Sequence, residues 1–147
     1  MENRPRPLIY FCALSPEDLA NSCSKNWVAS SNIEYKEIKN SLIEHRPEDG
    51  HKDWYAVTLY GFGSDKTNSH WEYRKKGEKP FVTDIGEKCL GTIKWVKSLP
   101  YSRIDDIRFL VIKSKGYITK HIDIPERNWL EPLNISLTYP KGNKFML

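Results

Sequence analysis

The chain has 147 residues, a length that suits one domain with a hydrophobic core. Its three cysteines are widely spaced and form no CxxC pair, which indicates neither a disulfide framework nor a zinc knuckle and favours a reducing cytoplasm. The 23 lysines and arginines are interleaved with 19 acidic residues. The charge therefore marks no nucleic-acid or membrane surface, and no apolar stretch is as long as a membrane span.

The first half of the sequence predicts two strands and two helices. The run LIYFCAL predicts a short buried strand, and the SPED tetrapeptide after it predicts the start of a brief helix. From Ser31 onward, apolar residues recur at helical spacing, which predicts a helix that ends near the segment RPEDG. The β-branched and aromatic residues over 54–60 predict a strand that two glycines close.

The next part of the sequence predicts a loop and then a third helix. Residues 64–80 are polar and contain Gly and Pro, so we expect a long loop there. A helix is expected over 86–97, with Cys89, Ile93 and Val96 along one side.

The last part predicts strands, because DIRFLVIKS, GYITKHIDI and PLNISLTYP are rich in β-branched and apolar residues. The first two runs are expected to form a hairpin that turns at 114–116. Helices precede strands, which predicts an α+β fold. We expect a single domain over 1–147, helical and mixed over 1–100, with the first strands of a sheet core over 101–147.

His121 and Asp123 are two positions apart in an expected strand, so their side chains point to the same side of the sheet. Many oxygen-activating iron(II) enzymes bind the metal with two histidines and one carboxylate, of which a His-x-Asp strand supplies two ligands. The motif alone is common. His121 would otherwise be a hydrogen-bonded histidine on a half-buried strand, with Asp123 orienting its ring.

The segment from Arg108 onward, RFLVIKSKGYITKHIDIPERNWLEPLNISLTYPKGNKF, resembles the core of one group of iron(II)- and 2-oxoglutarate-dependent dioxygenases, the aspartyl/asparaginyl β-hydroxylase-like branch. The shared features are an Arg-led strand, a Gly turn, a strand that ends in His-x-Asp, a loop with proline, and the strand LNISL closed by Pro-x-Gly. A looser similarity extends into the SLPYSRIDD linker. The resemblance implies N-terminal helices packed on a double-stranded β-helix, a jelly-roll or cupin-like core.

The resemblance also implies the chemistry of the site. Iron(II) would be bound by His121 and Asp123, and 2-oxoglutarate would occupy open metal positions as cosubstrate. The implied cosubstrate contacts are Asn134, Ser136, Arg108 and Tyr117. The implied reaction is hydroxylation of a peptidyl side chain or a free amino acid. Arg127 and Trp129 follow the motif, and they either line a substrate entrance or form an exposed loop pair.

The sequence departs from this family at one place. The family has a second histidine several strands later, followed by a basic residue that holds the far carboxylate of 2-oxoglutarate, but no histidine follows His121 here. His45, His51 and His70 lie upstream, in an expected helix end and expected loops. We therefore expect the chain to be the N-terminal portion of a longer enzyme, inactive alone, whose incomplete barrel leaves strand edges that favour self-association.

Two other function classes stay open. A non-catalytic jelly-roll module that binds a small ligand or a protein partner would not need the missing histidine. The basic run over 74–76, with Trp71 and Tyr73 beside it, would alternatively contact RNA or DNA by stacking and by attraction to phosphates. Flanking glutamates cancel part of its field, which favours a solvated loop instead.

Overall fold

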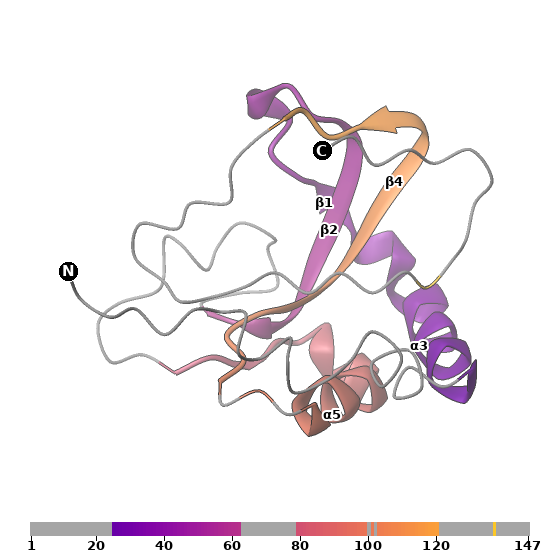
Figure 1. The fold of residues 1–147 in the computed structure, drawn as a ribbon, viewed down its shortest axis with the longest axis vertical. Helices are drawn as coiled ribbons and strands as arrows, with labels where there is room; N and C mark the ends of the chain where they lie inside the picture. Colours follow the sequence, from indigo (N-terminus) through magenta and orange to yellow (C-terminus); the bar gives the residue numbers. More distant parts are fainter. Residues whose placement is uncertain (1–24, 63–78, 100, 102, 121–136, 138–147) are drawn as a thin grey trace.

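The computed structural model describes residues 25–62, 79–99, 101, 103–120 and 137. Within these residues the elements follow the order α3 (Lys25–Ile38), β1 (Ile43–Glu44), β2 (Lys52–Gly61), β3 (Phe81–Val82), α5 (Leu90–Ser98) and β4 (Ile107–Tyr117) (Figure 1). Short 3-10 helices span Lys39–Ser41, Pro47–Asp49 and Gly86–Cys89. The predicted α+β class is confirmed.

The strands form one antiparallel sheet around β2. β4 pairs along most of one edge of β2, with Ala56 opposite Leu110 near the middle. The other edge pairs with β1 near Ala56 and with β3 near Tyr60. The aromatic and β-branched residues of β2 suit a strand with neighbours on both sides. The strand predicted over 54–60 is confirmed, and it extends slightly at both ends.

The hairpin predicted at 114–116 is wrong, because β4 continues as one strand through these residues to Tyr117. The register with β2 shifts there, and the extra residues of β4 form a bulge. Lys115 has a φ of 65°. A Cβ on Gly116 would lie 2.8 Å from the carbonyl oxygen of Lys52, so only glycine allows this close approach. The turn-like residues therefore distort a strand locally.

The helix predicted from Ser31 begins earlier and ends earlier than expected, because α3 spans Lys25–Ile38. The predicted end near RPEDG is the separate 3-10 helix Pro47–Asp49. Asn and Ser after α3 are poor helix formers, and the following residues pair with β2 instead. The helix predicted over 86–97 is confirmed as a 3-10 helix that leads directly into α5.

The hydrophobic core lies between the two helices and one face of the sheet, which we call the helix face. Its buried members are Ile38, Val57, Leu59, Cys89, Ile93, Ile107 and Phe109. The predicted apolar side of the third helix is confirmed, since Val96 also packs against this cluster. A Cβ on Gly86 would lie 1.9 Å from the Leu59 carbonyl oxygen. Glycine at this position therefore lets the segment before α5 touch β2.

Glu34 joins the two helices. Its carboxylate accepts hydrogen bonds from the backbone N–H of Gly91 at 2.8 Å and of Thr92 at 2.9 Å, and from the Thr92 hydroxyl. These N–H groups belong to the first turn of α5, where no carbonyl of the same helix can accept them.

Leu137 also contacts this part of the fold. Its carbonyl accepts a hydrogen bond from the Asn32 side-chain amide at 3.1 Å, and its side chain packs against the core.

Candidate functional site

The sheet face turned away from the helices, here called the second face, combines apolar and polar side chains. It comprises Trp54, Ala56 and Thr58 of β2 and their cross-strand partners Ile112, Leu110 and Arg108 of β4. Side chains alternate along a strand, and antiparallel partners share a face, so these residues lie opposite Val57 and Leu59 of the core. Thr58 and Trp54 are buried. Arg108, an implied cosubstrate contact, lies opposite Thr58.

Two histidines pack edge-on against Trp54. The ring centroids are 4.3 Å apart for His45 and 4.8 Å apart for His51, with interplanar angles of 82° and 87°. Each histidine is only 5% exposed. The backbone N–H of His45 also donates to the Trp54 carbonyl at 2.7 Å. A tight turn between the two histidines brings them to one aromatic residue.

Sequence reasoning missed this histidine cluster, because it placed His45 at a helix end and His51 in a loop. The signal that could have found it is the RPEDG segment between them. Pro47 begins a 3-10 helix there, and Gly50 has a φ of 81°. A turn between two residues six positions apart brings them close together, and the strand that follows supplies Trp54 as their common neighbour.

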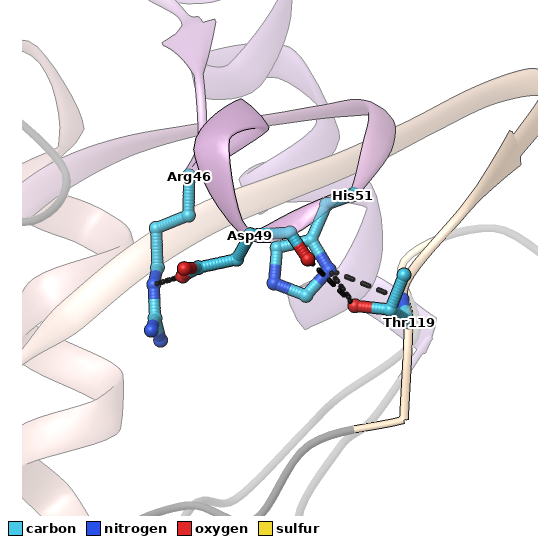
Figure 2. A network of polar contacts seen from close by, with 4 residues as sticks. All are labelled: Arg46, Asp49, His51 and Thr119. Carbon is cyan, nitrogen blue, oxygen red and sulfur yellow. Dashed lines mark hydrogen bonds and ion pairs between the residues drawn. The ribbon is translucent and has the colours of Figure 1, made fainter.

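His51 connects the turn before β2 with the segment after β4 (Figure 2). Its Nδ1 accepts the backbone N–H of Thr119 at 3.1 Å and lies 3.0 Å from Thr119 Oγ1. The Thr119 hydroxyl is also 3.2 Å from the Asp49 carbonyl oxygen, and the Asp49 carboxylate pairs with Arg46 Nε at 2.5 Å. A ring nitrogen that accepts an N–H has no proton, so His51 Nδ1 is unprotonated.

Arg108 forms an ion pair with Asp106 through its Nε. The side chains are 15% and 24% exposed respectively. Burial raises the pKa of Asp106 to about 6, and the charge of Arg108 opposes that rise. Burial also lowers the pKa of Arg108, and the negative charge of Asp106 opposes that fall.

The pKa of His45 is lowered to about 4, mainly by burial and then by the positive charges of Arg108 and Arg46. At neutral pH the imidazole of His45 is therefore uncharged.

The predicted site residues divide into two groups. Arg108 lies on the second face, and Tyr117 lies at the end of β4 with its side chain 53% exposed. The others lie outside the described residues, namely His121, Asp123, Arg127, Trp129, Asn134 and Ser136. His70 and the aromatic and basic residues over 71–76 also lie outside them.

Among the described residues, no set of three His, Cys, Asp or Glu side chains is arranged to hold a metal ion. His45 and His51 therefore do not form a metal centre with their described neighbours.

A cleft of about 260 Å³ opens on the opposite side of the sheet, near the end of α3. Its walls are Tyr35, Lys39, Asn40, Leu42, Tyr55, Val111 and Lys113. The Lys113 ammonium lies 3.9 Å from the centroid of the Tyr55 ring, a cation–π contact that occupies part of the wall. Because Tyr55 and Val111 project from the helix face, this cleft is separate from Arg108 and the histidines.

Comparisons of the chain with family models, with curated proteins and with solved structures found no match. Across the described ranges, neither helix combines the length and the apolar character that crossing a bilayer requires.

Proposed function

We propose that the protein is an iron(II)- and 2-oxoglutarate-dependent oxygenase with a jelly-roll core, acting on a peptidyl side chain or a free amino acid. In this proposal His121 and Asp123 bind the metal, and Asn134, Ser136, Arg108 and Tyr117 contact the cosubstrate. Iron bound with 2-oxoglutarate and O2 supplies the oxidation of a C–H bond, with succinate and CO2 as coproducts. The protein contributes binding, orientation and protection from water.

One observation supports this proposal most directly. Thr119 precedes His121 by two residues, and its backbone is hydrogen-bonded to the buried His51. Consecutive Cα atoms are 3.8 Å apart, so covalent geometry limits the His121 Cα to within about 7.6 Å of the Thr119 Cα. The motif therefore follows closely after a residue that is hydrogen-bonded to a buried histidine. A buried polar neighbour of this kind suits a metal centre that must orient its ligands and exclude side reactions.

The described residues are chemically compatible with such a site. His45 is neutral at pH 7, so it adds no positive charge beside a cation. The Asp106 carboxylate is paired with Arg108 and neutralises part of the positive charge of its guanidinium. In this proposal Arg108 forms part of the polar wall of the site. The far carboxylate of 2-oxoglutarate would be held by a residue other than this ion pair.

The deciding experiment is an anaerobic Fe(II) titration of the chain and of three variants. The chain should bind Fe(II), and His121→Ala and Asp123→Ala should each weaken binding at least tenfold, because each removes one ligand. Asp84→Asn, a substitution at an exposed carboxylate outside the motif, should bind like the unmodified chain. Loss of binding in the control as well would indicate nonspecific attraction to acidic residues.

A second candidate function is a non-catalytic jelly-roll module for a small ligand or a protein partner. The feature in its favour is that, within these 147 residues, no histidine follows His121. Equal and negligible Fe(II) binding by the chain and by His121→Ala would support this module. A nucleic-acid-binding function would instead depend on residues 71–76, and its affinity would fall steeply with added salt.

A further inference from the structure

The cleft beside the end of α3 combines aromatic walls with two lysines. Part of its surface is formed by Tyr55 and Val111, which are cross-strand partners on the helix face of β2 and β4. Another part is formed by Tyr35 of α3, whose ring packs edge to face with the buried ring of Phe109, with centroids 5.6 Å apart. The aromatic walls are therefore anchored in the sheet and in the hydrophobic core.

Two ammonium groups and one side-chain amide complete the cleft. Lys39 and Asn40 belong to the 3-10 helix that follows α3, and Lys113 projects from β4. None of the seven lining side chains is a carboxylate. The C-terminal end of α3 contributes a partial negative charge, equivalent to about half an elementary charge, which two full positive charges outweigh. The cleft therefore offers N–H donors and a positive potential to a ligand.

Lys113 is held at the wall of the cleft by the ring of Tyr55. Its Nζ lies 3.9 Å from the centroid of that ring. A cation–π contact uses the side of the ammonium that faces the ring, and the remaining N–H groups can donate to an acceptor. A lysine that is already positioned loses less rotamer freedom on binding an anion than a mobile one does. Lys97 makes the same kind of contact with Tyr60, at 3.8 Å, but neither residue lines the cleft.

We propose that this cleft binds a small anion that carries one aromatic ring, such as an aromatic carboxylate or an aryl phosphate. The tyrosines and the aliphatic residues Leu42 and Val111 contact the ring, and the two lysines and Asn40 bind the charged group. The volume of about 260 Å³ lies just below the range of about 300 to 1,000 Å³ for drug-sized ligands, so it suits a ligand of one ring. This site is independent of the proposed oxygenase function, because it lies on the helix face and includes no residue of the His-x-Asp motif.

The test is a titration of the ¹⁵N-labelled chain with four probes at physiological ionic strength, followed by backbone amide chemical shifts. Phenyl phosphate and benzoate carry both a ring and a charge, inorganic phosphate lacks the ring, and benzyl alcohol lacks the charge. We expect at least one aromatic anion to shift the amides of Lys39, Asn40 and Val111. It should bind about tenfold more tightly than the other two probes, because the ring and the charge each add contacts. The tighter of the two aromatic anions identifies the charged group that the cleft prefers.

Variants of the lysines locate the binding site. Lys113→Gln should weaken binding of the tighter aromatic anion about three- to fivefold, as expected for the loss of one exposed ion pair. Substitution of both Lys39 and Lys113 by Gln should weaken it at least tenfold. Lys97→Gln is the matched control and should change the affinity less than about twofold, with circular dichroism as the check that each variant folds.

Four results would overturn the proposal. Benzyl alcohol that binds as tightly as the aromatic anions would show that the charge adds nothing, and inorganic phosphate that does so would show the same for the ring. Equal losses of affinity in Lys97→Gln and Lys113→Gln would indicate general attraction to a basic protein. The absence of shifts at the cleft amides with both aromatic anions would show that the cleft binds neither.

Discussion

His45 and Asp106 are ionisable residues near one guanidinium, that of Arg108, and burial shifts their pKa values in opposite directions. The pKa of His45 falls from 6.5 to about 4. Between these values the native state binds fewer protons than the unfolded state, so stability decreases as the pH falls. The pKa of Asp106 rises from 3.8 to about 6. There the native state binds more protons, so stability decreases as the pH rises, and the two effects partly cancel.

His45→Gln should therefore make the protein less sensitive to acid. The contribution of His45 between pH 7 and pH 4.5 is roughly 2 to 3 kcal/mol. We expect the loss in free energy of unfolding over that range to be smaller in the variant by about this amount. Urea denaturation at the two pH values measures it.

Asp106→Asn provides the control of opposite sign for this prediction. The substitution removes a carboxyl group whose protonation stabilises the native state as the pH falls. Acidification should therefore lower the free energy of unfolding more in this variant than in the unmodified protein. The variant should also be less stable at pH 7, because the largely buried charge of Arg108 would lose its ion pair with Asp106. Identical acid sensitivity in both variants and the unmodified protein would contradict the assignment.

At the scale of elements, Glu34 of α3 supplies the acceptors that the first turn of α5 lacks within its own helix. A carboxylate at a helix N-terminus is also favoured by the helix dipole. Three donors converge on this one side chain, from Gly91 and Thr92. The packing of the two helices on the core therefore includes a polar contact at a defined position along α3.

Glu34→Ala should lower the free energy of unfolding by about 1 to 2 kcal/mol, the usual effect of removing a helix cap. Glu37→Ala is the matched control, because Glu37 lies on the same helix with its side chain exposed. That substitution should change stability by less than about 0.5 kcal/mol. Urea denaturation at pH 7 compares them, and equal losses would show that the contact with α5 adds nothing measurable.

The bulge in β4 lies where the local sequence alone predicts a turn. Ser, Lys and Gly in succession favour a turn when only neighbouring residues are considered. In the structure these residues lie opposite the start of β2, and the long pairing between β2 and β4 extends past them. A partner strand already in place can hold extra residues as a bulge without reversing the chain.

At the scale of the whole molecule, a metal that binds only the native state must stabilise it. Free ligand at 100 times its dissociation constant adds about 2.7 kcal/mol. For a chain of this size, that corresponds to a rise in melting temperature of roughly 5 to 10 °C. We expect this rise for the chain under anaerobic conditions with Fe(II), and none for His121→Ala. An equal rise in both would mean that iron binds away from the motif.

The sequence by itself determined the α+β class, the strand around Trp54 and the third helix with its buried side at Cys89 and Ile93. These features follow from residue periodicity and local propensity, which adjacent positions define. It also supplied the His121 motif, whose metal-binding role is a proposal. Only the tertiary structure decided that β4 is one bulged strand, and that His45, His51 and Thr119 gather at the second face. The contact between His51 and Thr119 joins residues 68 positions apart, and no local pattern encodes such a distance.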